Sequence, residues 1–384
     1  MRFLFFAAQY LPTAGGVERY THNLAKTLVA AGHSATVVTS ALPGLAAEET
    51  DEAGIRIFRL PARLWMAGRF PVPRGGKAFR RLSARLWENE YDFALINTRF
   101  YPLSLWAARQ CRRRHLPAIV LEHGTKHLDM GNQVLNLFGG WYEHAAMHLM
   151  RRYCDDFYGV SLACSEWLRH FGVTAKGVLY NAVDPAELKA LTDTPATNWR
   201  QRLGLAADAP LVAFVGRFIA EKGIWEMLDA FAILQGNHPA AALVMAGDGP
   251  LHAQAAQKKA PGVFLPGQVS YAESIALLHQ ADVFCLPTYS EGFSTTVLEA
   301  AVCGSFIVTT PTGGSPELIC DGKSGILLDS IAPAAIAGAL ARALDDAALR
   351  KAAAVRLAQR VEEHFTWRRT TEALLEISQR MAHP

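Results

Sequence analysis

The sequence lacks the features that define several large classes of protein. Its six cysteines, at positions 111, 154, 164, 285, 303 and 320, include no Cys-x-x-Cys pair, so neither a disulfide framework nor a structural zinc site is expected. No uncharged apolar run approaches the roughly 20 residues of a membrane-spanning helix, and the apolar start is too short for a signal peptide. We therefore expect reduced thiols and a cytoplasmic chain that does not span a bilayer.

The composition and length predict a globular protein of two domains. The chain has 384 residues, of which 51% are apolar and 19% charged, and a chain this long exceeds what one core usually supports. Apolar runs alternate with helical patterns, which is typical of a parallel, doubly wound sheet. Residues 184–210 lose this alternation and collect prolines, so the domain boundary is expected there, with domains at 1–183 and 184–366.

The alternation can be written as ranges. Strands are expected at 3–8, 36–40, 55–60, 94–97, 118–122, 157–160 and 178–180, and then at 211–216, 242–246, 263–265, 283–287, 306–309 and 325–328. Helices are expected at 17–31, 77–88 and 103–114, then near 223–235, 251–259, 271–280 and 296–303, with a helical tail from 332. Two such Rossmann-like halves form a cleft, and ligands bind at the carboxyl ends of the strands.

Two cations follow the strand at 211–216. Arg217 and Lys222 precede a helix that opens near Gly223. Cations beside a helix N-terminus can bind a diphosphate and stabilise its departure without a metal. The alternative is a solvated basic turn.

A pair of carboxylates follows the strand at 283–287. Glu291 lies in the loop, a helix is expected to start near Ser294 or Thr295, and Glu299 falls about one turn into it. The helix N-terminus suits an anion, and carboxylates accept hydrogen bonds from vicinal hydroxyls, so the segment suits a sugar and a ribose beside a phosphate. The alternative is a capped helix with ordinary surface glutamates.

Three further turns follow expected strands. Residues 310–317 include Gly313 and Gly314, which permit close backbone approach to a ligand, and residues 13–18 form a glycine turn compatible with phosphate. His123 ends the strand at 118–122, at the mouth of the sheet, although a lone histidine is usually structural. The turn at 247–250 is explained by structural need alone.

The positive charge is concentrated in one segment. Residues 56–115 carry fourteen Arg and Lys against three acids. Aromatic and apolar residues are interleaved with these cations, which is the composition of a surface that attaches to anionic lipid headgroups. The candidates for this surface are Arg63, Trp65, Arg69, Lys77, Arg80 and Arg81. A solvated basic face is the alternative, and nucleic acid is not an expected partner because no recognition motif is present.

Together these loops resemble the family 4 retaining glycosyltransferases, of GT-B architecture. The family's E-x7-E pattern is matched by Glu291 and Glu299, and its Arg-x4-Lys pair by Arg217 and Lys222. The Gly-Gly-Val-Glu turn at 15–18, Gly-Gly-x-Pro-Glu at 313–317 and the Asn-Ala-Val-Asp segment at 181–184, with alanine for the family's glycine, extend the resemblance over nearly the whole chain. It also implies a C-terminal helix, 367–384, that packs back on the first domain.

The resemblance assigns roles to these positions. Arg217 and Lys222 would bind the donor diphosphate, Glu291 the donor sugar and Glu299 the ribose, with His123 near the reacting sugar. The other implied donor contacts are Gly16, Gly292, Phe293, Ser294, Thr295 and Thr296.

The implied reaction moves a hexosyl residue, with retention, from a nucleoside-diphosphate sugar to a glycan or lipid-linked acceptor in cell-envelope polysaccharide or lipopolysaccharide synthesis. No cofactor or metal is expected, because the chain has no Asp-x-Asp motif and two cations stand in for the ion. The place expected is the cytoplasm, peripherally on the inner face of the membrane.

Other functions are compatible with parts of the pattern. A nicotinamide-dependent dehydrogenase would need G-x-G-x-x-G after a strand, which is not found. A sugar-nucleotide epimerase, a sugar-phosphate synthase and an inactive scaffold of a polysaccharide assembly complex remain alternatives. The donor also stays open among UDP-glucose, UDP-N-acetylglucosamine and GDP-mannose.

Overall fold

The computed structural model describes residues 1–13, 15–66, 68–128 and 133–382. The chain forms two compact units, which we describe separately. The N-terminal unit consists of Met1–Asn181 together with the C-terminal residues from Trp367 onward, and the C-terminal unit consists of Ala182–Thr366. The chain therefore leaves the first unit after Asn181 and returns to it at Trp367.

The N-terminal unit is built on a largely parallel sheet with the strand order β10-β9-β8-β7-β1-β2-β4-β3. Only β3 runs antiparallel to its neighbour among the strands described in this sheet. The strands are β1 (Arg2–Phe6), β2 (Ser34–Ser40), β3 (Glu48–Thr50), β4 (Arg56–Leu60), β7 (Phe93–Asn97), β8 (Ala118–Glu122), β9 (Phe157–Gly159) and β10 (Gly177–Val178).

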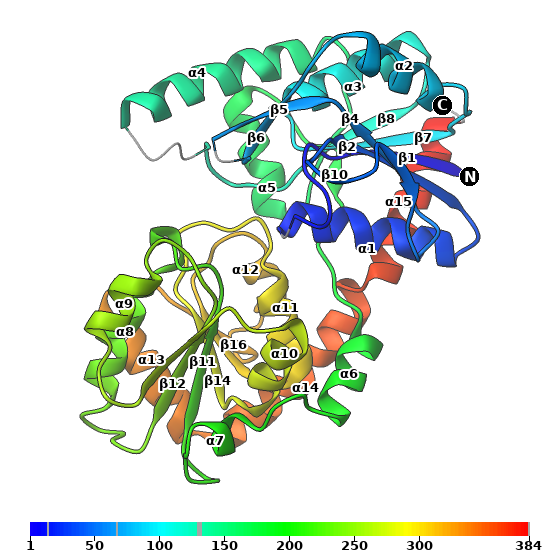
Figure 1. The fold of residues 1–384 in the computed structure, drawn as a ribbon. Coiled ribbons are helices and arrows are strands. Elements are labelled where there is room, and N and C mark those ends of the chain that lie inside the picture. Colours follow the sequence, from blue (N-terminus) through cyan, green and yellow to red (C-terminus); the bar gives the residue numbers. More distant parts are fainter. Residues whose placement is uncertain (14, 67, 129–132, 383–384) are drawn as a thin grey trace. The chain divides into compact units, whose positions relative to one another are not determined.

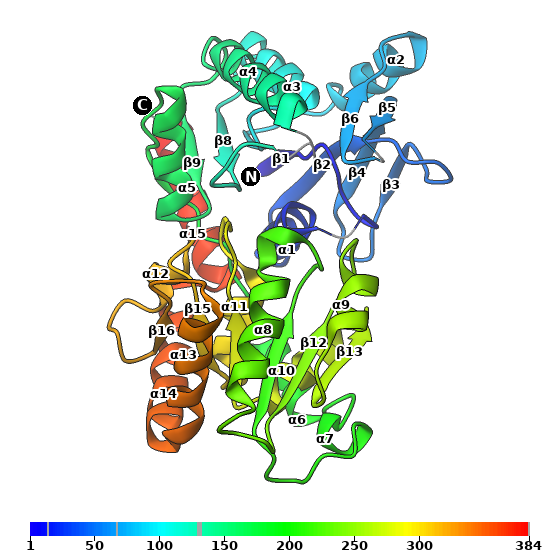
Figure 2. The ribbon, with the colours of Figure 1, turned by 90° about the vertical axis from the view of Figure 1, so that its left-hand side faces the viewer.

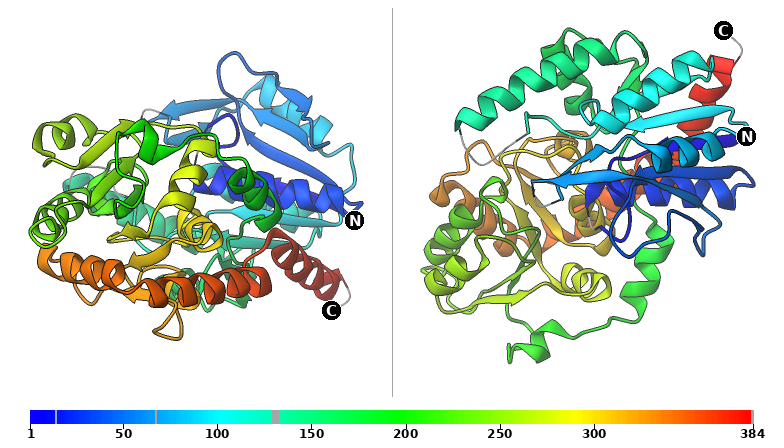
Figure 3. Two further views of the ribbon diagram at one scale, coloured as in Figure 1. Left: turned by 90° about the horizontal axis from the view of Figure 1, so that it is seen from below. Right: turned by 45° about the horizontal axis from the view of Figure 1, so that its top comes forward.

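Helices cover both faces of this sheet (Figures 1 and 3). Leu4 and Phe6 of β1 belong to a core shared with α2, α3 and α4, whereas α1 and α15 pack together on the other side. Because both faces are buried, β1 reads as a continuous apolar run, as parallel strands do. These helices are α1 (Gly16–Ala30), α2 (Lys77–Leu86), α3 (Pro102–Arg113), α4 (Gln133–Met150), α5 (Leu162–Trp167), the 3-10 turn η1 (Leu168–Phe171) and α15 (Trp367–Ala382).

The C-terminal unit contains a second parallel sheet, ordered β13-β12-β11-β14-β15-β16. Helices α8, α9 and α13 lie on one face, and α10, α11 and α14 lie on the other (Figures 1 and 2). The strands are β11 (Leu211–Val215), β12 (Ala242–Ala246), β13 (Val263–Gly267), β14 (Val283–Leu286), β15 (Phe306–Thr309) and β16 (Gly325–Leu327). The helices are η2 (Ala220–Lys222), α8 (Ile224–Leu234), α9 (His252–Lys258), α10 (Tyr271–Gln280), α11 (Thr295–Cys303), α12 (Ser315–Leu318), α13 (Pro333–Asp345) and α14 (Ala347–His364).

The predicted α/β architecture with two doubly wound sheets is confirmed, and every expected strand is present with ends shifted by a few residues. Within residues 184–210, where the sequence predicts the domain boundary, the chain forms α6 (Pro185–Asp193) and α7 (Trp199–Arg202). Asp184 caps α6 by accepting hydrogen bonds from the backbone N–H groups of Ala186 and Glu187, so a helix begins directly after this residue.

Several elements were not expected from the sequence, and two of them bear on the site. A separate antiparallel hairpin of β5 (Ala62–Trp65) and β6 (Phe70–Pro73) precedes α2, and α4 follows the loop after β8. Of the helices in the described residues, none combines the length and apolar character needed to cross a bilayer.

Trp199 provides a test of how α7 is held in the C-terminal unit. Its ring is fully buried, and its indole N–H donates to the carbonyl of Glu273 at 3.0 Å. We expect Trp199→Ala to lower the free energy of unfolding by about 3–5 kcal/mol, because it leaves a cavity and removes this hydrogen bond. Urea unfolding followed by far-UV circular dichroism measures this loss. The control is Trp141→Ala on α4, where the ring is 72% exposed; equal effects of the two changes would contradict the prediction.

Candidate active site

The loop between β11 and α8 carries both predicted cations. Arg217 is exposed and Lys222 ends η2. Gly223 follows with φ 69° and occupies the N-cap of α8, as the sequence predicted. A Cβ at Gly223 would come within 2.2 Å of the carbonyl oxygen of Pro287, so this position requires glycine and the loop lies directly against the loop after β14.

The loop after β14 brings the first predicted glutamate to Lys222. The Lys222 ammonium forms an ion pair with Oε1 of Glu291. The two loops are also joined through the carbonyl of Glu221, which accepts hydrogen bonds from the backbone N–H of Tyr289 and the hydroxyl of Thr288, both at 2.8 Å. Two segments about 70 residues apart therefore form one charged surface at the carboxyl ends of β11 and β14.

Helix α11 begins where the sequence predicted. Ser294 occupies the N-cap position, although its side chain makes no capping hydrogen bond. Glu299 lies on the second turn and is only 5% exposed. Of the other implied donor contacts, Phe293 and Ser294 are buried, and Gly292, Thr295 and Thr296 are partly exposed. The segment thus places a helix N-terminus next to the Lys222–Glu291 pair.

The glycines of the 310–317 loop lie against the loop that follows β14. A Cβ at Gly313 would lie 2.4 Å from the carbonyl oxygen of Gly292, and one at Gly314 would overlap the ring of Phe293. The N–H of Gly314 also donates to the carbonyl of Gly292 at 3.1 Å. These glycines therefore allow the Gly292 backbone and the Phe293 ring to approach and help to set their position, and the predicted approach to a ligand stays a prediction.

The N-terminal unit holds Gly16 and His123 at the carboxyl ends of its own strands. Gly16 is the first residue of α1, and a Cβ there would meet nothing within 4 Å. The Glu18 side chain folds back against Gly15, and burial raises the pKa of its carboxyl group. The start of α1 thus combines an open backbone position with a buried carboxyl group.

His123 is fixed in one tautomer by a neighbour that sequence reasoning missed. Asn97, at the end of β7, donates its amide N–H to the carbonyl of Phe6, so its Oδ1 faces His123 Nε2 at 2.8 Å. An amide oxygen only accepts, so Nε2 must carry the proton and Nδ1 keeps its lone pair. Burial lowers the pKa of His123 to about 3, which keeps the ring neutral. The sequence feature that could have indicated a role for Asn97 is that it is a polar residue at the end of an apolar strand.

A buried charge network supports the loop that follows His123. Arg99 pairs with Glu122 and Glu143, and all three side chains are almost completely buried. Glu122 Oε1 accepts hydrogen bonds from the N–H groups of His123 and Gly124 at 3.0 and 3.1 Å, and Glu143 Oε1 accepts one from Leu128 at 2.7 Å. Arg99 and Glu143 were not predicted, because nothing in their spacing marks them as partners.

The predicted basic residues lie on the hairpin and on α2 of the N-terminal unit. Trp65 is 59% exposed at the end of β5, and the cations around it are also exposed. The ring of Phe70, on β6, contacts Tyr142 of α4 with a centroid distance of 5.7 Å. The exposed cations of this group are Arg63, Arg69, Lys77, Arg80 and Arg81.

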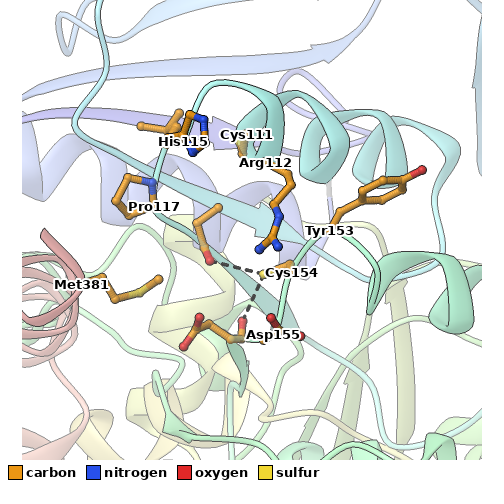
Figure 4. Close-up of a pocket in the computed structure, with 11 residues that line it drawn as sticks. Cys111, Arg112, His115, Pro117, Tyr153, Cys154, Asp155 and Met381 are labelled. Atoms are coloured by element: carbon orange, nitrogen blue, oxygen red, sulfur yellow. Dashed lines mark hydrogen bonds between the residues drawn. The ribbon is translucent and has the colours of Figure 1, made fainter. Parts of the chain in front are cut away.

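A pocket of the N-terminal unit is lined by none of the predicted site residues. It has a volume of about 480 Å³ and is lined by residues that include Arg112, His115, Cys154 and Asp155 (Figure 4). The Cys154 thiol donates to the carbonyl of Ala118, the first residue of β8, and to the carbonyl of Asp156, the residue before β9. This pocket is therefore at the amino ends of the strands, opposite the edge that carries His123.

Comparison with known proteins identifies the class. The model for "Glycosyltransferase Family 4" matches residues 14–187, and the model for "Glycosyl transferases group 1" matches residues 195–360. A GDP-mannose-dependent alpha-(1-6)-phosphatidylinositol monomannoside mannosyltransferase of Mycolicibacterium smegmatis is 28% identical over 389 residues, which cover 95% of each chain.

Solved structures share the fold. Sucrose-phosphate synthase from Thermosynechococcus elongatus superposes with a TM-score of 0.77 and 21% identity, covering 99% of this chain and 98% of that one. The Anabaena protein HepE, solved with UDP-glucose, gives 0.72 and 20% identity, covering 98% and 99%. The fold is thus the GT-B architecture of glycosyltransferases, and the chain belongs to the family 4 glycosyltransferases.

The low pKa of His123 predicts how this residue affects stability. In the unfolded chain His123 binds a proton below about pH 6.5, whereas in the native protein it stays neutral down to about pH 3. The free energy of unfolding therefore falls as the pH is lowered from about 6.5 to about 3, and this residue has no effect on it above about pH 6.5. We expect His123→Gln to reduce that fall by up to about 1.4 kcal/mol per pH unit, as measured by urea unfolding between pH 7.5 and 5.

Nuclear magnetic resonance gives a direct check of the same property. The Hε1 resonance of His123 should stay constant from pH 8 to pH 5. A midpoint for His123 within this range would refute the neutral assignment.

Proposed function

We propose that the protein is a retaining glycosyltransferase that moves a hexosyl residue from a nucleoside-diphosphate sugar to a glycan or lipid-linked acceptor. The observation that carries the proposal is the Lys222–Glu291 ion pair beside the N-terminus of α11. It places a cation for phosphate, a carboxylate for sugar hydroxyls and a helix N-terminus for an anion on one surface of the C-terminal unit.

Each of these groups has a distinct task in the proposed reaction. Arg217 and Lys222 neutralise the diphosphate, which competes with Glu291 for the ammonium group. Glu291 then accepts hydrogen bonds from the donor sugar, and buried Glu299 accepts them from the ribose. The two side-chain cations supply the charge that a metal ion would otherwise provide, so the transfer is proposed to be metal-independent.

The proposed chemistry is front-side substitution. The bond from the anomeric carbon to the diphosphate oxygen breaks, and a bond to the acceptor oxygen forms on the same face. The acceptor proton passes to the departing phosphate oxygen. No carboxylate is needed as a nucleophile, in contrast to the pair in a retaining glycosidase. The roles of Gly16 and His123 rest on the family resemblance, and neutral His123 suits a contact with an uncharged sugar.

Relatives support the proposed classes of donor and acceptor. One relative is named for transfer from GDP-mannose to a phosphatidylinositol mannoside, and one solved structure holds UDP-glucose. Cell-envelope polysaccharide or lipopolysaccharide synthesis is the setting that we propose, at the cytoplasmic side of the membrane. UDP-glucose, UDP-N-acetylglucosamine and GDP-mannose are the first donors to test.

The donor site is tested by Lys222→Ala. In a thermal-shift panel of nucleotide sugars, the true donor should raise the unfolding temperature of the wild-type protein by mass action. Lys222→Ala should lose this shift and lower kcat by about 10²–10³, the cost of removing one group that stabilises developing charge. Lys258→Ala, at an exposed lysine on α9, is the matched control and should behave as wild type.

Two outcomes would overturn parts of this proposal. If no nucleotide sugar shifts the wild-type protein, or if Lys222→Ala turns over normally, the donor-site assignment fails. If transfer occurs but the product has the inverted anomeric configuration by nuclear magnetic resonance, only the retaining mechanism fails.

The N-terminal unit carries a surface that suits attachment to an anionic membrane. Trp65 lies among exposed cations, and α4, which contacts the same hairpin, exposes Phe138 by 67% and Trp141 by 72%. Cations attract lipid headgroups while exposed aromatic side chains enter the interface. A lipid-linked acceptor is found at such a surface, which connects the basic segment to the proposed reaction.

Vesicle sedimentation tests this attachment. Each cation near an anionic surface contributes about 1 kcal/mol, so neutralising Arg80 and Arg81 to Gln should weaken binding to phosphatidylserine vesicles by roughly tenfold to 30-fold at low salt. The double change Lys258→Gln with Lys259→Gln alters the net charge equally, on the other unit, and should have little effect. Failure of the wild-type protein to sediment at low salt would exclude the attachment.

A further inference from the structure

Three histidines from separate parts of the N-terminal unit meet at one place. His127 lies in the loop after β8, His144 on α4 and His170 in η1. One ring nitrogen of each histidine lies within 4.8 Å of those of the other two. Among the described residues, this is the one group of three or more His, Cys, Asp or Glu side chains whose possible metal ligands lie this close together. None of them belongs to the donor-binding residues, which are in the C-terminal unit apart from Gly16 and His123.

Their spacing is close to that of imidazoles around one ion. Nitrogens bound to a tetrahedral zinc ion at about 2.0–2.1 Å lie about 3.3 Å from one another. Nε2 of His127 and Nε2 of His170 are 3.0 Å apart. His144 is exposed, so a small change of its rotamer can bring the third nitrogen in. Its ring centroid is 5.0 Å from that of His170 and 5.9 Å from that of His127.

Aromatic neighbours hold the rings in place. The ring of His170 stacks on Trp167 at 4.8 Å with an interplanar angle of 6°, and Phe171 packs against His144 at 4.7 Å and His127 at 5.6 Å. The packing of these aromatic rings therefore helps to fix the positions of the three histidine rings.

The charges behind the histidines favour a cation. Oε2 of Glu143 lies 3.3 Å from Nδ1 of His127, on the side of the ring away from His170. A carboxylate in this position orients a metal-bound histidine and raises its basicity. Glu143 belongs to the buried network with Arg99 and Glu122, in which two carboxylates face one guanidinium. The network thus has one more negative than positive formal charge.

We propose that His127, His144 and His170 bind one divalent transition-metal ion, with Zn²⁺ as the ion of choice, and that the fourth position is open to solvent. Three imidazoles suit Zn²⁺, and the exposed His144 and His170 leave an entry path. The ion joins the loop that carries His123 to α4 and η1, and it stabilises that loop. None of its ligands is among the residues proposed to bind the donor phosphates, so the transfer itself keeps its two side-chain cations.

Metal titration of tag-free protein tests the site. After treatment with a chelator and desalting, isothermal titration with ZnCl₂ should show one tight site per chain, and Zn²⁺ should raise the unfolding temperature. His144→Gln and His170→Gln should each weaken binding by at least the roughly 10- to 100-fold that loss of an outer-shell partner costs. Both side chains are exposed, so neither change threatens the fold.

The matched control is His148→Gln, one helical turn beyond His144 on α4, where the exposed ring contacts Arg152. It should bind Zn²⁺ as the wild-type protein does. Cobalt gives a second readout, since Co²⁺ in a tetrahedral site absorbs visible light strongly; the wild-type spectrum should be lost in His127→Gln. The proposal is overturned if the wild-type protein binds Zn²⁺ no more tightly than the His144→Gln, His170→Gln double variant.

Discussion

The parallel direction of the strands is the constraint on which both units depend. In a parallel sheet all carboxyl ends meet at one edge, so the loops that follow neighbouring strands converge there. Arg217 follows β11 and Glu291 follows β14, and these two strands are paired. His123 follows β8, and Asn97 ends the adjacent β7. The pairing of strands thus brings together groups that lie far apart in the chain.

The two units stabilise their converging loops in different ways. In the C-terminal unit the backbones themselves are in contact, and Gly223 and Gly313 are required because any Cβ would collide with a carbonyl of the next loop. In the N-terminal unit, buried ion pairs stabilise the loop, with Arg99 between Glu122 and Glu143. Removing one member of such a network leaves an uncompensated buried charge, so these residues act as a set and constrain the loop from His123 to Leu128.

Much of the fold could be predicted because hydrophobic periodicity and turn residues are local properties. The strands at β1, β8 and β11 follow from continuous apolar runs, and the start of α11 at Thr295 follows from the polar segment before it. The helix α6 was missed because Asp184 and Pro185 also occur in loops, and a capped helix start looks the same locally. The hairpin of β5 and β6 was missed because its strands are short and its side chains largely exposed.

The sequence by itself determined the α/β class, the family and the identity of the charged loops, because the Glu291 and Glu299 spacing and the Arg217 and Lys222 pair are short-range patterns. Only the tertiary structure decided which of these groups meet. The Lys222–Glu291 pair spans 69 residues and the His123–Asn97 contact spans 26. His127, His144 and His170 have no shared motif and converge only through packing of α4 and η1 on the loop after β8. The spacing of residues in a motif is visible in the sequence, whereas contacts between distant segments depend on how the chain folds.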